Sequence, residues 1–335
     1  MAKFILSIDG GGIRGLIPAV ILVELERRLA ASGRSKPIAH YFDVIAGTSA
    51  GGIIAAGLTC PNPDGSGRPA CTASDLVALY EQEGHEIFQT DVFARLRRTL
   101  LNPGSIFDER YSADPLEKKL KARLGERMLS EALTKVVITA YDITERKAKF
   151  LTNGRSSDGK ASDDYLFHEV ARATSAAPTY FEPALVQNFT LECNETLVDG
   201  GVFANDPALC AVLEAKKLGY HDEDLHILSL GTGSNNRAYA YSDACNWGAF
   251  GWIDPARGAP IISILMQGQS STTSYQMQRL YGARYLRLDC ELKNASDELD
   301  SASTKNLPKL RLEAEKIIAA SSAKLDAFIA LLPSP

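Results

Sequence analysis

Short apolar runs alternate with amphipathic stretches at the start of the chain. Residues 3–9 (KFILSID) form an apolar run that ends at a cluster of glycines, which is typical of a buried strand. Residues 16–31 then show helical spacing, with Pro18 in the first turn, where proline is tolerated. A second short strand is predicted at 41–46, and a helix of small residues at 53–58. The pattern therefore predicts two successive strand–helix units.

The same alternation continues through the rest of the chain. Ser162, Asp163 and Asp164 supply start signals for a helix that covers residues 165–173. Further strands are predicted at 135–143, 147–152, 195–199 and 225–230, and a further helix at 205–219. Short apolar strands that alternate with helices favour an α/β fold with a mostly parallel, buried central sheet.

The organisation of the chain indicates one domain. The sequence has no internal repeat and no long linker, so we expect a single domain over residues 1–335. Within it, the segment at about 60–110 has the composition of an inserted helical and loop segment, and about 306–332 is predicted to be a helical C-terminal segment.

Composition and charge narrow the classes of partner. The chain is 45% hydrophobic and 23% charged, with a net charge of -5, so no global basic field favours a nucleic acid polymer. No uncharged apolar run approaches the roughly 20 residues of a membrane span. No basic-then-apolar leader precedes the first strand. We therefore expect a soluble, cytoplasmic protein.

The cysteines do not indicate a metal or redox site. None of the six forms C-x-x-C, so neither a zinc ribbon nor a thioredoxin-type pair is supported. Scattered thiols in a chain of this size are typical of reduced, packed cysteines. Cys60 and Cys71 flank a loop and would pair only in an exported protein.

The second strand ends in a candidate nucleophile. Ligands bind beyond the carboxyl ends of strands in open α/β sheets, and residues 47–51 (GTSAG) are the only G-x-S-x-G in the chain. A nucleophile elbow needs this position between strand and helix, with small residues such as Gly47 and Gly51 around a strained serine. The sequence therefore favours Ser49 as a nucleophile. The alternative is that Ser49 merely caps the following helix.

A serine hydroxyl needs an adjacent base. The five histidines do not fit the order of a Ser-His-Asp triad, because none stands late at a strand end; they are His40, His85, His168, His221 and His226. Asp199 ends a predicted strand and precedes two glycines, which permit a close approach. Burial in an apolar cleft would raise the pKa of its carboxyl group and make it a better base. The alternative is that Asp199 caps a turn before NDPAL.

Two stretches match nucleotide-binding patterns only in part. Gly10, Gly12 and Gly15 fit G-x-G-x-x-G, but a dinucleotide site needs an acid at the end of the next strand, which ends in the serine motif instead. Amides at a helix N-terminus accept other negative charges equally well. Residues 154–161 (GRSSDGKA) miss the P-loop pattern because Ala161 lacks the hydroxyl group that would bind magnesium. Neither nucleotide interpretation is favoured.

Taken in order, DGGGIRG, GTSAGG and VDGG resemble the motifs of the patatin-like phospholipases. The stretches LTKVVITAYDI, ATSAAPTYFEP and LSLGTGS also resemble blocks of that family, so the likeness covers about residues 3–290. NDP at 205–207 stands where plant members often have two asparagines, a departure that leaves the catalytic assignment untouched. The resemblance implies a three-layer α/β/α fold related to the α/β hydrolases.

The resemblance also implies the chemistry. It assigns Ser49 as the nucleophile and Asp199 as the base of a Ser-Asp dyad that cleaves phospholipids or other acyl lipids, without a metal or cofactor. The oxyanion hole falls on Gly10, Gly11 and Gly12, with Arg14 at the basic position of the family. Two alternatives stay open, namely an acyltransferase that uses the same serine and a regulated membrane-degrading effector, for example one activated by a nucleotide.

One further segment is a candidate for membrane contact. In residues 92–107, apolar side chains alternate with three arginines, a pattern that an interfacial or lid segment would show. The alternative is a packed helix with a charged face. The apolar positions are Phe93, Leu96, Leu100 and Leu101, and the arginines are Arg95, Arg97 and Arg98.

Overall fold

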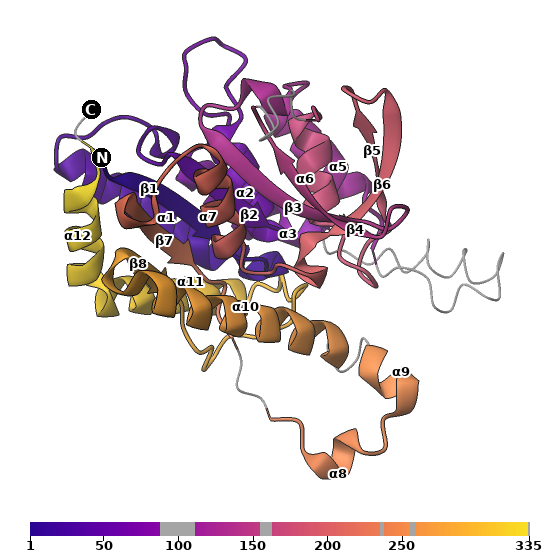
Figure 1. Ribbon diagram of the computed structural model, residues 1–335. Helices are drawn as coiled ribbons and strands as arrows, with labels where there is room; N and C mark the ends of the chain where they lie inside the picture. The colour runs from indigo at the N-terminus through magenta and orange to yellow at the C-terminus, as the bar shows by residue number, and fades with distance from the viewer. Residues whose placement is uncertain (88–110, 155–162, 235–237, 255–258, 334–335) are drawn as a thin grey trace.

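The chain folds around one mixed β-sheet in the computed structural model, which describes residues 1–87, 111–154, 163–234, 238–254 and 259–333 (Figure 1). The strands are β1 (Lys3–Ile8), β2 (Val44–Thr48), β3 (Lys135–Asp142), β4 (Lys147–Thr152), β5 (Ala184–Asn188), β6 (Cys193–Asp199), β7 (Leu225–Leu230) and β8 (Tyr285–Leu288). Their order is β5-β6-β3-β2-β1-β7-β8, with β4 also paired to β3. The neighbouring strands β3, β2, β1, β7 and β8 are parallel to one another. Strands β4 and β6 pair antiparallel with β3, and β5 pairs antiparallel with β6. The predicted α/β class with a mostly parallel sheet is confirmed.

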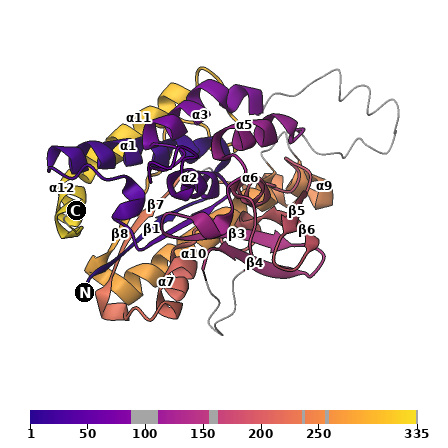
Figure 2. The ribbon, with the colours of Figure 1, turned by 90° about the horizontal axis from the view of Figure 1, so that it is seen from above.

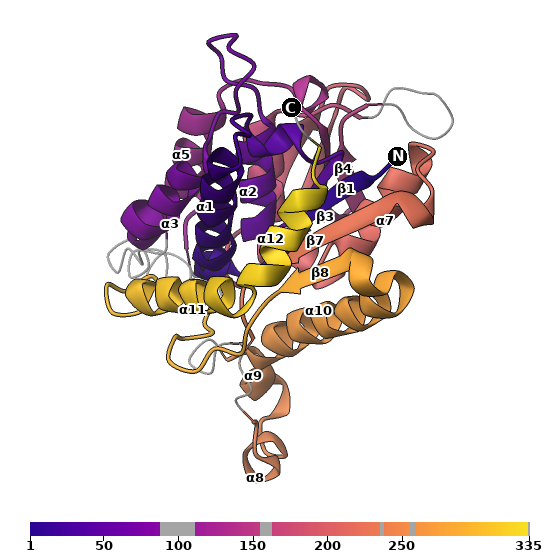
Figure 3. The same cartoon turned by 90° about the vertical axis from the view of Figure 1, so that its left-hand side faces the viewer.

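Helices cover both faces of the sheet (Figures 2 and 3). One face carries α1 (Leu16–Ala31), α2 (Ala50–Thr59), α3 (Ala73–Ile87), α5 (Asp114–Leu124), α6 (Phe167–Thr174) and α11 (Leu307–Ala320). The other face carries α7 (Ala208–Lys217) and α10 (Pro260–Tyr281). The three-layer α/β/α arrangement is therefore confirmed.

Each central strand is mostly apolar because both of its faces are covered. Along β1, Phe4 and Leu6 belong to the core under α1 and α2, while Ile5 between them belongs to the core under α7. Side chains alternate between the two faces of a strand, so a strand covered on both sides needs apolar residues on both faces. This is why the short apolar runs predicted the central strands.

The parallel register brings the glycine motifs to one edge of the sheet. Ile8 at the end of β1 pairs with Gly47 on β2 and with Leu230 on β7. The segments that follow these strands therefore emerge side by side at the carboxyl edge. The turn Gly12–Gly15 follows β1, and α2 follows β2.

The start of α6 differs from the sequence prediction. The helix begins at Phe167, not after Asp163 and Asp164. The Leu129 amide donates to the carbonyl oxygen of Tyr165, and Leu166 forms a β-bridge with Met128, so the chain is extended there. Asp164 accepts a hydrogen bond from the Ser130 amide instead of capping the helix.

Several predicted segments fall partly or wholly outside the described residues. The insertion predicted at about 60–110 contains α3, but residues 88–110 are not described. The arginine-rich stretch 92–107 and most of the P-loop-like stretch 154–161 also lie outside the described residues. The helical C-terminal segment corresponds to α11 and α12 (Ser322–Leu331). The division into one domain stays a prediction. Within the described ranges, no helix is long and apolar enough to cross a membrane.

The chain between β7 and β8 was not predicted from the sequence. It forms α8 (Tyr241–Ala244) and α9 (Gly248–Ile253), which extend away from the body, and then the long helix α10 (Figures 1 and 3). The helix α10 packs against α7 and β8 at the second face of the sheet. It thereby closes one side of the space beyond the carboxyl ends of the strands.

Candidate active site

Ser49 stands alone in the turn between β2 and α2. Its backbone has φ 54° and ψ −124°, a conformation that side-chain-bearing residues rarely adopt and that active sites retain at a cost of about 1–3 kcal/mol. The Ser49 amide donates to Thr174 Oγ1 at 2.8 Å, which holds the turn from the direction of α6. The Ser49 side chain makes no capping hydrogen bond to α2. The interpretation of Ser49 as a simple helix cap is therefore wrong.

Two glycines make this turn sterically possible. A Cβ atom on Gly47 would lie 2.1 Å from the carbonyl oxygen of Gly51, and one on Gly51 would lie 2.2 Å from the carbonyl oxygen of Ile8. Both distances are far below van der Waals contact, and both obstacles are backbone atoms. The elbow thus requires glycine at both positions so that α2 can approach β1 and β2.

Gly51→Ala is expected to destabilise the protein by about 3 kcal/mol or more, because the backbone of β1 must shift to admit the new methyl group. Urea unfolding followed by circular dichroism measures the change. The matched control is Gly268→Ala in α10, where a Cβ atom meets nothing within 4 Å. That substitution should stabilise the helix by up to about 1 kcal/mol. Equal unfolding midpoints for wild type and Gly51→Ala would contradict the steric argument.

Asp199 reaches the same place from the end of β6. Thr48 pairs with Thr139 on β3, and the next residue of β3, Ala140, pairs with Asp199. Strand β3 therefore holds the end of β2 and the end of β6 on its two sides. Ser49 and Asp199 are both buried, with 5% and 1% of their surfaces exposed.

The environment of Asp199 suits a proton acceptor. Burial raises the pKa of its carboxyl group to about 7, while the nearby Ser49 hydroxyl and the Gly201 amide oppose that rise. Oδ1 accepts a hydrogen bond of 2.7 Å from the Gly201 amide, as in the turn-capping interpretation. Oδ2 is buried and has no hydrogen bond of ordinary geometry among the described residues. One oxygen thus holds the turn, and the other is available for chemistry.

The loop after β1 lies directly beside Ser49. A Cβ atom on Gly10 would lie 3.2 Å from the Cβ atom of Ser49. The Gly10 amide already donates to the carbonyl oxygen of Asn205 at 3.0 Å, and the Gly10 carbonyl accepts from Thr232 Oγ1 at 2.8 Å. In the described part of the chain, the amides of Gly11 and Gly12 make no hydrogen bond. These two amides are free to bind a developing negative charge.

Arg14 and Arg287 hold the loop after β1 in place through hydrogen bonds. Arg14 donates to the carbonyl oxygens of Gly233 at 2.7 Å and of Gly11 at 3.3 Å, so it ties the loop to the end of β7. Arg287 of β8 donates to both carboxylate oxygens of Asp9, at 2.8 and 2.7 Å, and to Asp289 at 2.6 Å. Sequence reasoning missed Arg287, because nothing in the short strand β8 indicates its long-range partner.

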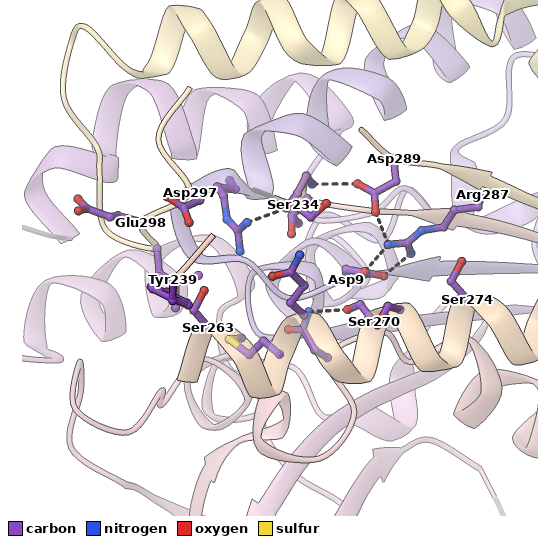
Figure 4. Close-up of a pocket in the computed structure, with 18 residues that line it drawn as sticks. Asp9, Ser234, Tyr239, Ser263, Ser270, Ser274, Arg287, Asp289, Asp297 and Glu298 are labelled. Atoms are coloured by element: carbon purple, nitrogen blue, oxygen red, sulfur yellow. Dashed lines mark hydrogen bonds and ion pairs between the residues drawn. The ribbon is translucent and has the colours of Figure 1, made fainter. Parts of the chain in front are cut away.

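Two cavities of different character adjoin the loop. The first, of about 50 Å³, is mainly apolar and reaches Ser49; its walls include Ile53, Leu79, Leu116 and Phe181. The second, of about 280 Å³, is polar and is drawn in Figure 4. Its walls include Ser234, Ser263, Ser270, Asp289 and Arg287. Leu299 contributes to both cavities.

The histidines lie elsewhere. None of the five, all of which are described, lines either cavity, in agreement with the sequence argument against a triad. His226, for example, is on β7 and stacks on Phe4, with ring centroids 5.5 Å apart. No cluster of three or more His, Cys, Asp or Glu side chains suited to a metal ion is found in the described ranges. Cys60 and Cys71 are both buried as free thiols.

A known family shares these motifs. A family model described as patatin-like phospholipase matches residues 6–212 of this chain, a range that includes the glycine loop, Ser49 and Asp199. The chain belongs to the patatin-like phospholipase family. Membership supports a lipid acyl hydrolase activity in general terms.

Two named plant relatives agree with this assignment. Patatin-like protein 1 of Arabidopsis thaliana is 35% identical over 94% of this chain and 81% of its own length. Patatin-2-Kuras 3 of Solanum tuberosum is 34% identical over 94% of this chain and 83% of its own length. Among solved structures, VipD from Legionella pneumophila aligns with 97% of this chain and 67% of its own chain, at 12% identity and a TM-score of 0.43.

Proposed function

We propose that this patatin-like protein hydrolyses the fatty acyl esters of phospholipids or other acyl lipids through Ser49 and Asp199. The observation that carries this proposal is the meeting of a serine in a strained elbow with a buried carboxyl group whose pKa is raised to about 7. A strained serine alone, or a buried carboxyl group alone, could have a purely structural explanation. Together they supply a nucleophile and its base, which is the combination that ester cleavage requires.

In this mechanism Ser49 attacks the ester carbonyl while Asp199 Oδ2 accepts the serine proton. The bond from the acyl carbon to the alcohol oxygen then breaks, Asp199 gives the proton to the leaving alcohol, and the acyl group stays on Ser49. The negative charge on the carbonyl oxygen is stabilised by the free amides of Gly11 and Gly12, at the N-terminus of the following helix. The Gly10 amide does not bind this charge, because it already donates to the carbonyl oxygen of Asn205. Arg14 acts as a positioning residue that holds the loop through Gly11 and Gly233.

The two cavities suggest how a lipid is oriented. The apolar cavity reaches Ser49 and suits the part of the acyl chain next to the ester, since its walls are side chains such as Ile53, Leu79 and Phe181. The polar cavity on the other side of the loop fits the remaining, polar part of the lipid. The ester would then lie across the glycine loop, with its carbonyl oxygen toward the amides.

Product analysis tests the proposal. The protein is incubated with mixed phospholipids, with and without an added alcohol, and the products are identified by mass spectrometry. Release of free fatty acid is the expected result. Dominant formation of the alcohol ester would instead favour the acyltransferase alternative, since only the second acceptor differs. No acyl release from any lipid would overturn the proposal.

Ile53→Phe is expected to shift the chain-length preference, because the larger ring fills part of the apolar cavity one turn of α2 beyond Ser49. For a series of nitrophenyl esters, kcat/KM should fall about tenfold more for long chains than for the acetate. Ile54→Val is the matched control, since Ile54 is buried on the same helix outside the cavity. A uniform loss over all chain lengths in Ile53→Phe would show that the cavity does not hold the acyl chain.

A further inference from the structure

Two buried oxygen atoms beside Ser49 lack a hydrogen-bond donor. They are Asp199 Oδ2 and Asn205 Oδ1, and neither has a partner within the described residues. Asn205 is 5% exposed and Asp199 is 1% exposed. Buried acceptors are nearly always satisfied, because leaving one unpaired costs about 1–3 kcal/mol. The Ser49 hydroxyl lies close enough to Asp199 to lower the pKa of its carboxyl group, so Asn205 Oδ1 in particular indicates a donor that arrives from outside the chain.

The glycines around these atoms place them in one space. The position that a Cβ atom would take on Gly201 is 3.1 Å from Asp199 Oδ1 and 3.5 Å from Asn205 Oδ1. The corresponding position on Gly10 is 2.4 Å from Asn205 Oδ1 and 3.2 Å from the Cβ atom of Ser49. The side-chain oxygen of Asn205, Oδ1, thus lies between the two glycines, close to both Ser49 and Asp199. A side chain on Gly10 would collide with Asn205 Oδ1, so glycine at this position lets Asn205 approach Ser49 closely.

The orientation of the Asn205 amide follows from its other contacts. Asn205 Nδ2 donates to Ser270 Oγ at 2.9 Å, on the α10 wall drawn in Figure 4, and to the carbonyl oxygen of Gly10 at 3.4 Å. The Gly10 carbonyl oxygen can only accept a hydrogen bond, so the side-chain nitrogen of Asn205, Nδ2, must face it. The backbone of Asn205 is held by Gln269 and by the Gly10 amide. Asn205 Oδ1 is therefore directed into the space beside Ser49.

The donor that suits two converging acceptors is a molecule with two hydrogens in a small volume. Water has both properties, and a buried water typically needs two to four polar partners. In the acyl-enzyme the Ser49 hydroxyl has become an ester and no longer offers a hydrogen to Asp199. At that stage both oxygens are available to a water molecule.

We propose that Asn205 Oδ1 and Asp199 Oδ2 together hold the water that hydrolyses the acyl-enzyme. This role rests on the proposed dyad and adds a residue to it. The water donates one hydrogen to Asn205 and the other to Asp199, which directs its lone pair at the acyl carbon. The water oxygen forms the new C–O bond and its proton passes to Asp199. The bond from the acyl carbon to Ser49 Oγ then breaks, the proton returns to Ser49, and the fatty acid leaves.

The two chemical steps should respond differently to a change at Asn205. Acylation uses Ser49 and Asp199 but no water, whereas deacylation needs the water in place. Stopped-flow hydrolysis of a short-chain nitrophenyl ester separates the burst, which reports acylation, from the steady rate, which reports deacylation. For Asn205→Leu we expect deacylation to slow about 10- to 100-fold relative to acylation. An acyl adduct should then accumulate on Ser49 and be visible by intact mass spectrometry.

A second readout is the choice of acceptor. Wild type should prefer water over added methanol, and Asn205→Leu should lose this preference, so the ratio of methyl ester to fatty acid rises. Gln278→Ala is the control, because Gln278 is exposed on the same helix α10 and its side chain donates to the Gly282 carbonyl oxygen instead of contacting Asn205. That variant should keep the wild-type ratio of the two rates. If leucine prevents folding, Asn205→Ala is expected to show the same split.

Three outcomes overturn specific claims. Equal slowing of burst and steady rate in Asn205→Leu, with an unchanged methanol ratio, would assign Asn205 a purely structural role. Wild-type kinetics in that variant would remove it from the mechanism. Full ester hydrolysis in Ser49→Ala would instead contradict the dyad itself, and so the two failures are distinguishable.

Discussion

Ser49→Ala is expected to lower ester and phospholipid hydrolysis by about 10,000-fold or more, to near the background rate. Alanine removes the nucleophilic hydroxyl group of Ser49 and leaves the surrounding cavity, the glycine loop and Asp199 in place. Substrate therefore still binds, but no covalent intermediate forms. Initial rates with a nitrophenyl ester and with mixed phospholipids measure the loss, and circular dichroism confirms that the variant is folded.

The control for this variant exploits the strain in the elbow. Glycine adopts φ 54° far more readily than alanine does, so Ser49→Gly should be more stable than Ser49→Ala by about 1 kcal/mol while being equally inactive. A fluorophosphonate probe should label wild type at Ser49 and label neither variant. Full activity in Ser49→Ala, or labelling at a different serine, would assign the chemistry to another residue.

The parts of this fold that the sequence predicted are those set by local patterns. Strands β1, β2, β3 and β7 are short apolar runs because each is buried on both faces. Strand β8 is only four residues long and contains Arg287, whose charge is neutralised by Asp9 from a distant part of the chain and by Asp289 two residues further on. A pattern search sees an arginine there and no strand. The pairing that stabilises β8 exists only in the folded sheet.

The same division runs through the candidate site. Ser49 and Asp199 were found because each stands at a strand end next to glycines, and such turns have a local signature. Asn205 was noted only as part of NDP, and its position depends on Gly10, Ser270 and Gln269. Two of these residues lie on α10, which the sequence did not reveal because its apolar positions follow no clear face. What was missed is therefore the support that distant segments give to the site.

Asp199→Asn is expected to reduce kcat by about 10,000-fold, because an amide cannot accept the proton of Ser49. The dependence of wild-type kcat/KM on pH should report the ionisation of the Asp199 carboxyl group. With the pKa of Asp199 raised to about 7, kcat/KM should fall about tenfold for each pH unit below 7, as the base becomes protonated. The residual activity of Asp199→Asn should lack this dependence. A profile that stays flat from pH 5 to 8 in wild type would exclude Asp199 as the base.

The same substitution should make the protein more stable at alkaline pH. Because burial raises the pKa of Asp199 from 3.8 to about 7, the native state holds this proton more tightly than the unfolded chain does. The wild-type free energy of unfolding therefore falls as pH rises from about 4 to about 7, and by pH 8 the buried charge costs on the order of 4 kcal/mol. Asparagine can keep the hydrogen bond from the Gly201 amide and carries no charge. Thermal unfolding of both proteins should thus show a stability difference that is small at pH 4, grows through the neutral range and favours Asp199→Asn at pH 8. A wild-type protein that is the more stable of the two at pH 8 would mean that Asp199 is paired with a cation and not buried as a lone carboxylate beside Ser49.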